Sequence, residues 1–392
     1  MMRMPFTKAE YLERLSKVKA SMSEKGIDVL LITDPANMNY VIGYDAWSFY
    51  VHQIVVVTLD DEMPRFIGRY MDAFCGAVKT TYLEKDHVHA YSDDHVQSTI
   101  KHPMDYMAKV LTELGYDKKR IGVEMDAYWF TAMAYERLKV GLPNAQFVNA
   151  HNLVNWVKII KSDAEIELMR KAGKIVDLAM KAGIDALDVG VRQCDVAAAI
   201  LHAQTVGTPE FGGDYIAIEP LMPAGETAGA PHLTWDDSRY TTGTTMYIEI
   251  AGAYKRYHCP MCRTISLGET SKQVEDVAKI TVEGLNAALE TVKPGVTCEE
   301  VEAAWRNVLS KYGYAKESRI GYSTGLNYPP DWGEHTASLR PGDKTVLQPN
   351  MTFHCIPGMY FDDFGVSISQ CIRVTENGHE EFAKYPKELV IK

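Results

Sequence analysis

Several features of membrane, secreted and nucleic-acid-binding proteins are absent from this chain of 392 residues. It has no run of 18 or more apolar residues, so no transmembrane helix is predicted. Its first residues, MMRMPFTKAEYLERL, lack the apolar stretch of a secretory signal. Acidic residues outnumber basic ones by 52 to 41, and no basic cluster occurs. This balance argues against nucleic acid and anionic membrane surfaces as partners.

Cysteine is also scarce. The seven cysteines are widely spaced and odd in number, which, without a predicted signal, favours free thiols and a cytoplasmic location. Cys259 and Cys262 have the spacing of a zinc or redox pair. However, zinc needs a second such pair, and a thioredoxin-type pair should begin a helix after a strand. Because this pair lies between strand patterns, two buried thiols are the favoured interpretation.

Apolar residues, in contrast, are plentiful enough for two domain cores, at 46% of the chain. Over residues 1–158, helical and strand patterns alternate, which predicts an α/β domain. The helices expected there are 9–25, 104–114 and 129–140, and the strands are 28–33, 54–58 and 65–68.

A second domain is predicted over residues 159–392. The capping box Ser162-Asp-Ala-Glu165 begins a long helix to residue 186, and Thr297-Cys-Glu-Glu300 begins another that reaches Tyr312. Helices grouped on one side of a curved sheet would make this an α+β domain. A further helix is expected at 192–204, and strands at 215–218, 246–251, 263–267, 352–356 and 366–374.

Segments along the whole chain resemble the creatinase/aminopeptidase P hydrolases, whose catalytic domain has the pita-bread fold. The segments are Lys161–Lys171, Lys293-Pro-Gly295, Arg340-Pro-Gly342 and Val374–Gly378. The resemblance implies a creatinase-like N-terminal domain over 1–158 and a pita-bread catalytic domain over 159–392. It also implies a homodimer in which the N-terminal domain of one subunit contributes to the active site of its partner.

Most members of this family bind two metal ions through two Asp, one His and two Glu. The corresponding positions in this sequence are Glu249, Pro260, Tyr322, Ile356 and Ser369. Only Glu249 is anionic, and one carboxylate cannot hold a divalent ion against water. We therefore expect no metal, no other cofactor and no peptidase activity.

Within the family, the chain most resembles a metal-free branch that opens the ring of ectoine, a zwitterionic cyclic amidine. Creatine is not expected as substrate, because Cys262 and Val51 stand at two of creatinase's substrate-binding positions. Gln370 stands where this branch has an acidic residue. The resemblance implies hydrolysis of ectoine, or of 5-hydroxyectoine, to N-acetyl-2,4-diaminobutyrate. The segments that carry it are Trp47–Gln53, Gly212–Tyr215, Pro231–Asp237, Glu249–Gly252, Tyr254–Pro260, Tyr328–Glu334 and Met351–His354.

Glu249 and His232 are the predicted catalytic residues. An amidinium carbon is electrophilic without a Lewis acid, and a carboxylate facing it could hold the cation, attack it or take a proton from water. Strand alternation places Glu249 on one face with Tyr247 and Ala251. His232 matches the general-base histidine of creatinase and suits a proton shuttle near neutrality. Asp236 either orients His232 or caps a turn.

A small zwitterion also needs aromatic faces for its cation and donors for its carboxylate. His52 and Arg263 are the candidate donors, although Arg263 is equally typical of a structural arginine in a strand. The candidate aromatic faces are Trp47, Phe49, Tyr50, Tyr322 and Trp332.

Three alternatives remain beside this prediction. Gly321-Tyr-Ser-Thr-Gly325 matches the nucleophile elbow of serine hydrolases, with Asp363 and His379 in the matching order. The elbow must lead into a helix, which Pro329 and Pro330 forbid. The other two are another amidine or guanidine C–N hydrolase of the creatinase type, and a non-catalytic osmolyte-binding protein on the same scaffold.

Overall fold

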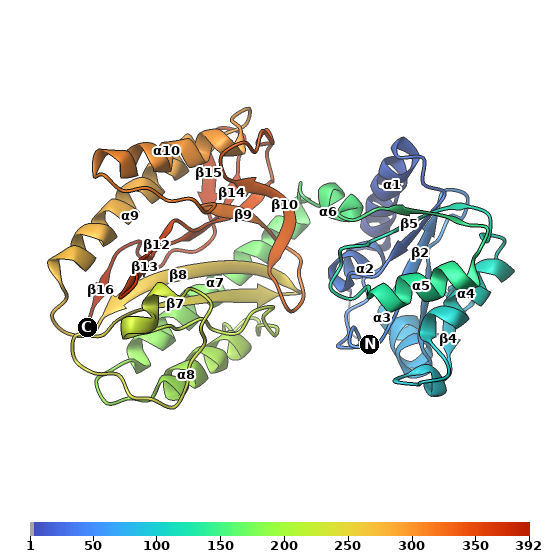
Figure 1. Cartoon of the computed structure of the whole chain (residues 1–392), viewed down its shortest axis with the longest axis horizontal. Helices are drawn as coiled ribbons and strands as arrows, with labels where there is room; N and C mark the ends of the chain where they lie inside the picture. Colours follow the sequence, from blue (N-terminus) through green and yellow to red (C-terminus); the bar gives the residue numbers. More distant parts are fainter. Residues whose placement is uncertain (1–3) are drawn as a thin grey trace. The chain divides into compact units, whose positions relative to one another are not determined.

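The computed structural model describes residues 4–392, which form two compact units that divide between Lys158 and Ile159 (Figure 1). The N-terminal unit contains a six-stranded mixed sheet of order β4-β3-β2-β1-β5-β6. Its central strand β1 pairs antiparallel with β2 and parallel with β5. The strands are β1 (Val29–Ile32), β2 (Ile54–Thr58), β3 (Arg65–Arg69), β4 (Val88–Tyr91), β5 (Arg120–Val123) and β6 (Gln146–Asn149).

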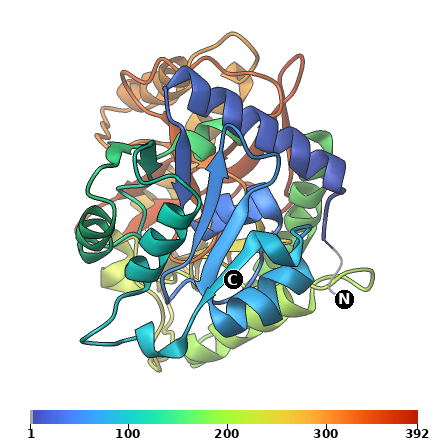
Figure 2. The ribbon, with the colours of Figure 1, turned by 90° about the vertical axis from the view of Figure 1, so that its right-hand side faces the viewer.

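Helices cover this sheet, and every residue of β1 is buried. Side chains of α4 and α5 form a core with β1, β2 and β5, and Figure 2 shows the blue strands with the dark blue helix α1 alongside. The helices are α1 (Lys8–Glu24), α2 (Pro35–Ile42), α3 (Val78–Thr80), α4 (Pro103–Glu113), α5 (Ala132–Gly141) and α6 (Leu153–Val157), with the π-helix η1 (Met71–Ala77) and the 3-10 turns η2 (Lys85–His87) and η3 (Asp93–His95).

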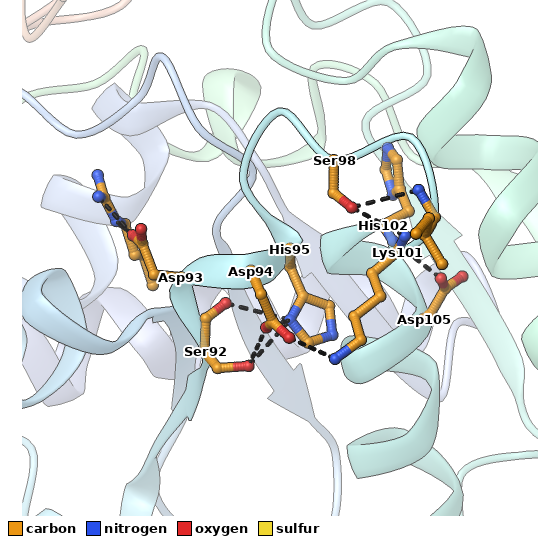
Figure 3. A network of polar contacts seen from close by, with 10 residues as sticks. Ser92, Asp93, Asp94, His95, Ser98, Lys101, His102 and Asp105 are labelled. Atoms are coloured by element: carbon orange, nitrogen blue, oxygen red, sulfur yellow. Dashed lines mark hydrogen bonds and ion pairs between the residues drawn. The ribbon is translucent and has the colours of Figure 1, made fainter.

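Polar side chains fix the segment between β4 and α4 (Figure 3). The Nδ1 of His102 accepts a hydrogen bond from the N–H of Met104, and the Asp105 carboxylate accepts one from the N–H of His102. This reciprocal cap satisfies two N–H groups at the start of α4. Lys101 pairs with Asp94 in the same segment.

The C-terminal unit is built on the long hairpin of β7 and β8, which α7 covers. A Cβ added to Gly252 would lie 2.1 Å from the carbonyl oxygen of Ala172, so α7 sits directly on the backbone of β7. The helices are α7 (Asp163–Ala186), α8 (Gln193–Val206), α9 (Lys272–Thr291) and α10 (Cys298–Lys311), with the turn η4 (Gly225–Gly229).

Three sheets make up this unit, with orders β16-β8-β7, β10-β9-β11-β14-β15 and β12-β13. Helices α9 and α10 pack on the strands through a large apolar core. The strands are β7 (Thr245–Tyr254), β8 (Tyr257–Ser266), β9 (Gly321–Thr324), β10 (Gly333–Leu339), β11 (Thr352–Cys355), β12 (Gly358–Tyr360), β13 (Gly365–Ser367), β14 (Gln370–Val374), β15 (His379–Glu381) and β16 (Val390–Ile391). Among residues 4–392, every helix is too short or too polar to span a lipid bilayer.

Two predicted strands need correction. Residues 215–218 are irregular rather than a strand, because the N–H of Ala217 bonds to the Nε2 of His258 instead of a neighbouring backbone. The strand expected at 366–374 is broken, since the N–H of Ser369 bonds across to Cys262. Cys259 and Cys262 are buried free thiols, as predicted, although they lie inside β8 rather than between strands. Helix α9 was not predicted.

Candidate active site

The candidate site is built around Glu249 on β7. Its backbone N–H and C=O bond to Leu221 at 2.9 and 3.0 Å, and it faces Cys262 across the hairpin. The side chain is only 7% exposed. Among residues 4–392, no group donates a hydrogen bond to its carboxylate, and burial raises its pKa to about 8. Because an unpaired buried acid is destabilising, this position is typical of a group that meets a ligand.

Two apolar clusters flank Glu249 on its face of β7. On one side, Tyr247 packs with Cys262, Ala228, Ile356 and Tyr360. The hydroxyl of Tyr247 is buried and has no hydrogen-bond partner in the described part of the chain. On the other side, Ala251 packs with Trp332, Tyr322, Ala217 and Ile218. The carboxylate therefore lies between two aromatic groups, in surroundings that suit a small, flat cation.

A series of hydrogen bonds joins Trp332 and Tyr322 of the second cluster to His354 and Ser369, and we call it the Tyr322 network. The Nε1–H of Trp332 donates to the Tyr322 hydroxyl at 2.8 Å, and this hydroxyl lies 3.0 Å from the Nδ1 of His354. The Nε2 of His354 lies 2.7 Å from the Ser369 hydroxyl, which also accepts from the N–H of Cys262 at 2.7 Å. Burial lowers the pKa of His354 to about 3, so its ring is neutral at pH 7.

The residues at the family's metal positions do not fit a pair of divalent cations. The hydroxyls of Tyr322 and Ser369 are both bonded to His354, and burial holds the pKa of Tyr322 well above its usual value, so it is no phenolate ligand. Ile356 packs on the Tyr247 cluster. Within residues 4–392, no group of three or more His, Cys, Asp or Glu side chains could hold a metal ion.

His232 lies in the irregular segment between η4 and β7, and its side chain is exposed. The carbonyl of Leu233 accepts from the N–H of Met222 at 2.9 Å, next to Leu221, which pairs with Glu249. The segment of His232 is thus linked to the strand of Glu249 through one intervening segment. No hydrogen bond or ion pair joins the two side chains in the described residues, so the role of His232 stays a prediction.

Two predicted residues have structural contacts instead. The Asp236 carboxylate accepts from the N–H of Ser238 at 2.7 Å, so it caps a turn, the alternative considered above. Arg263 is fully buried and donates to the backbone carbonyls of Cys262, Ser369, Tyr385 and Pro386. These contacts contradict its predicted role as a substrate donor, because its guanidinium is already engaged with the backbone.

The N-terminal unit carries the other predicted binding residues. Trp47 and Tyr50 are 56% and 65% exposed, and the rings of Trp47 and Phe49 lie 4.9 Å apart. The ring of His52 lies 4.9 Å from that of His102. Burial, and then His102, lower the pKa of His52 to about 4. His52 is therefore neutral at pH 7 and could bind a carboxylate only as an uncharged donor.

In the C-terminal unit, Trp332 is only 1% exposed, so it contributes its N–H through Tyr322 rather than an open aromatic face. Tyr322 remains half-buried. The serine-hydrolase alternative is contradicted, since Ser323 is fully buried in β9 and its hydroxyl pairs with that of Thr336 at 2.6 Å rather than with a histidine.

Four residues near the site were not predicted. Tyr247 could have been found from strand alternation with Glu249, and His354 lies in the motif Met351–His354, to which no role was given. Tyr360 and Arg319 gave no signal in the sequence. Arg319 lies over the Tyr322 ring, with its guanidinium carbon 4.6 Å from the ring centre.

Comparisons with known proteins identify the family and the fold of the chain. The model of metallopeptidase family M24 matches residues 167–376, and that of the creatinase/prolidase N-terminal domain matches residues 14–160. Ectoine hydrolase of Halomonas elongata is 45% identical, over 99% of both chains. An uncharacterized hydrolase/peptidase of Sinorhizobium fredii is 44% identical, over 99% of this chain and 98% of that one.

Among solved structures, dipeptidase PepE from Mycobacterium ulcerans superposes with a TM-score of 0.82 at 25% identity, over 98% of this chain and 99% of that one. A prolidase from Thermococcus sibiricus gives a TM-score of 0.85 at 21% identity, over 97% and 99%. The predicted fold class, an α/β N-terminal domain followed by an α+β pita-bread catalytic domain, is confirmed.

Proposed function

Because the chain belongs to metallopeptidase family M24 and carries a creatinase/prolidase N-terminal domain, we propose that it is a hydrolase that opens the cyclic amidine ring of ectoine. The observation that carries this proposal is the Glu249 carboxylate, buried and without a hydrogen-bond partner in residues 4–392. A cationic amidinium would supply both the missing charge and the missing donors. The 45% identity to ectoine hydrolase of Halomonas elongata supports the same substrate.

The proposed reaction begins when the amidinium plane meets Glu249. The carboxylate either attacks the amidinium carbon itself or takes a proton from a water molecule that attacks it. In the second route, the C–O bond forms and Glu249 becomes protonated. The C–N bond then breaks as the ring nitrogen receives that proton, which leaves an amide and an amine. His232, the predicted proton shuttle, would pass to solvent the hydroxyl proton that remains on the oxygen of the new amide.

We propose that this reaction needs no metal ion. The amidinium carbon is already electron-poor, and the residues at the family's metal positions are engaged in other contacts. In particular, the Tyr322 and Ser369 hydroxyls both bond to His354. The product is proposed to be N-acetyl-2,4-diaminobutyrate, from ectoine and, in hydroxylated form, from 5-hydroxyectoine.

Arg319 replaces Arg263 as the proposed partner of the substrate carboxylate. Its guanidinium donates to the Ser338 hydroxyl at 3.1 Å and has no ion-pair partner in the described residues. It also lies over the ring of Tyr322, which packs beside Ala251 near Glu249. Exchange of Arg319 for Gln should raise KM about tenfold or more with little change in kcat, because a charged contact of this kind contributes about 1.5–3 kcal/mol. An unchanged KM would contradict this role.

We further propose a homodimer in which the aromatic residues Trp47, Phe49 and Tyr50 of one subunit complete the site of the other. The exposure of Trp47 and Tyr50 supports a surface that becomes covered. Subunit mixing tests this arrangement. Inactive Trp47→Ala and Glu249→Gln proteins should regain part of the wild-type rate when mixed, because one hybrid site is intact. Mixtures that stay inactive, or a monomer in sedimentation, would contradict it.

The proposed function is tested by incubating the purified chain with ectoine and following the ring-opened product by NMR. Turnover is expected. Binding without turnover would instead favour an osmolyte-binding protein. Turnover of an acyclic guanidine or amidine in place of ectoine would favour another C–N hydrolase of the creatinase type.

A further inference from the structure

The Tyr322 network contains four side chains whose hydrogen atoms can be assigned from chemistry alone. Trp332 Nε1 and the backbone nitrogen of Cys262 can only donate. They stand at opposite ends of the series and point inward, at 2.8 Å to Tyr322 and at 2.7 Å to Ser369. Between them lies His354, which is neutral and therefore carries one ring proton. The direction of every other hydrogen bond depends on which ring nitrogen holds that proton.

The Ser369 hydroxyl indicates which ring nitrogen of His354 carries the proton, because its own proton has one acceptor within hydrogen-bond distance. The residue is fully buried, and in the described part of the chain its hydroxyl contacts only the N–H of Cys262 and the Nε2 of His354. If Nε2 carried the proton, Ser369 would accept twice and its own proton would be buried without an acceptor, which is unfavourable. If Nε2 carries no proton, it accepts a hydrogen bond from the Ser369 hydroxyl. The ring proton of His354 therefore lies on Nδ1.

This assignment determines what Tyr322 can do. With its proton on Nδ1, His354 donates to the Tyr322 oxygen, which also accepts from Trp332. Both acceptor positions of that oxygen are then occupied. The Tyr322 proton is left without an acceptor in residues 4–392, and Tyr322 is only half-buried, whereas Trp332, His354 and Ser369 are buried. Tyr322 is thus the partly exposed member of the network, and it packs beside Ala251 on the Glu249 face of β7.

The free proton of Tyr322 lies in the neighbourhood of Glu249. Tyr322 packs against Ala251, which lies on the same face of β7 as Glu249. After burial, the charge of Glu249 is the largest cause that raises the pKa of Tyr322, which keeps its hydroxyl protonated. No hydrogen bond joins Tyr322 to Glu249 among the described residues. A ligand can therefore accept a hydrogen bond from Tyr322 and place its cation beside Glu249.

We propose that Trp332, His354 and Ser369 force Tyr322 to act as an obligate hydrogen-bond donor to the departing ring nitrogen of the substrate. This inference rests on the proposed opening of a cyclic amidinium. In the free cation, both ring nitrogens carry protons and share their lone pairs with the central carbon, so neither accepts. Once oxygen adds to that carbon, the lone pair becomes localised and can accept from Tyr322.

The contact therefore forms only as the reaction proceeds, which lowers the barrier without tightening substrate binding. Tyr322 donates the hydrogen bond but keeps its proton. As the C–N bond breaks, its electron pair moves to the nitrogen and receives the proton that Glu249 took from water, while the first lone pair keeps the hydrogen bond from Tyr322. No charge is therefore left on Tyr322, His354 or Ser369. In this arrangement Tyr322 touches the reacting atoms, whereas His354 and Ser369 are positioning residues.

The ring proton of His354 is tested first, by nitrogen NMR of the full-length protein labelled with ¹⁵N-histidine. The signals of His354 are identified by their loss in His354→Gln. We expect a protonated Nδ1 and a bare Nε2, unchanged between pH 5 and pH 9. A proton on Nε2, or a charged ring within this range, would overturn the inference whether or not the protein turns over ectoine.

The donor role of Tyr322 is tested by kinetics with ectoine. Tyr322→Phe should lower kcat about 100-fold or more, as removal of a transition-state donor does elsewhere, with KM changed less than about threefold. Ser369→Ala frees the His354 ring to carry its proton on either nitrogen, so a smaller fall in kcat is expected. Ser323→Ala is the matched control, because this buried serine on β9 bonds to Thr336 outside the network.

The outcomes separate this inference from the proposed function. A wild-type kcat in Tyr322→Phe, or a loss confined to KM, would overturn the donor role while leaving ectoine hydrolysis intact. A protein that shows the expected His354 proton but opens no cyclic amidine would retain the assigned network and lose the proposed function. Circular dichroism and thermal melting of each variant distinguish misfolding from loss of the donor.

Discussion

Two buried glutamates, one in each unit, differ in the hydrogen bonds that their carboxylates accept. Glu124 in the N-terminal unit is 1% exposed and Glu249 in the C-terminal unit is 7% exposed. Glu124 accepts from the N–H groups of Thr33 and Asp34 at 2.7 and 2.8 Å and from the Asn37 amide at 2.7 Å. Glu249 has no such partner among residues 4–392. Burial alone therefore does not distinguish the two acids, whereas the absence of hydrogen-bond donors around Glu249 does, and the proposed function rests on that difference.

A raised pKa, like burial, does not by itself distinguish the two acids. Burial, and then the charge of Asp34, raise the pKa of Glu124 to about 7 in spite of its donors. Burial alone raises the pKa of Glu249 to about 8. The donors around Glu124 come from the start of α2, where they fix the chain after β1. The side chain of Glu249 holds no segment of the chain in place, which is the basis for the proposal that it meets a ligand.

The variant Glu249→Gln is expected to have the largest effect and tests the difference between the two acids. We expect turnover of ectoine to fall at least about 1000-fold, since the group that binds, attacks or takes the proton is lost. The free energy of unfolding at pH 8 should stay equal or rise, because an unfavourable buried charge is removed. Product formation and chemical denaturation measure the two effects. A near-normal rate would reassign the nucleophile or base.

The opposite pattern is expected for Glu124→Ala. Three buried donors would lose their acceptor, so the free energy of unfolding should fall by about 3 kcal/mol. The kcat of the folded variant should remain within about twofold of the wild type. Urea denaturation and kinetics below the unfolding transition measure these quantities. A stable variant that has lost activity would mean that the two acids do not differ as described.

The proposed role of Glu249 also predicts how kcat/KM depends on pH. The pKa of Glu249 in the free protein is raised to about 8, so its protonated form predominates at pH 7 and cannot bind a cation as an anion. We expect kcat/KM to fall about tenfold per pH unit below pH 8, because kcat/KM reports the free enzyme. Initial rates from pH 5.5 to pH 9 test this slope. A flat profile would show that Glu249 does not ionise in the productive step.

The raised pKa also predicts how stability depends on pH. An acid with a folded pKa of about 8 and an ordinary value of 4.5 binds its proton more tightly in the folded state, so its contribution to stability falls as pH rises through this window. Glu249→Gln should remove that part of the slope, while Ser323→Ala should keep it. Thermal melting between pH 5 and pH 8 compares the variants, and parallel slopes would contradict this assignment.

The smallest expected effect is that of chelation. Since Glu249 is the one carboxylate at the family's five metal positions, prolonged treatment with EDTA should leave the rate within experimental error. Dialysis against metal-free buffer followed by assay is the measurement. Loss of activity that manganese or zinc restores would refute metal independence.

Part of this site could be predicted from the sequence and part could not. The strand pattern around Glu249 fixes which neighbours share its face, because alternation is a local property of strands. The Tyr322 network is different, since Trp332, His354 and Ser369 come from separate segments that meet only in the folded sheet. Arg263 shows the same limit, because its buried carbonyl partners near residues 385 and 386 have no local signature.

Ile356 has a consequence for how such a site could change. The family resemblance implies a carboxylate at its position, and it packs on the cluster beside Glu249. A mutation to glutamate there would not restore a ligand pair by itself, because two acids would crowd the same apolar pocket and repel each other. Tyr322 and Ser369, at two other such positions, have hydroxyls bonded to His354. Under the proposed metal independence, a change to a metal-binding site would therefore require several replacements together rather than one.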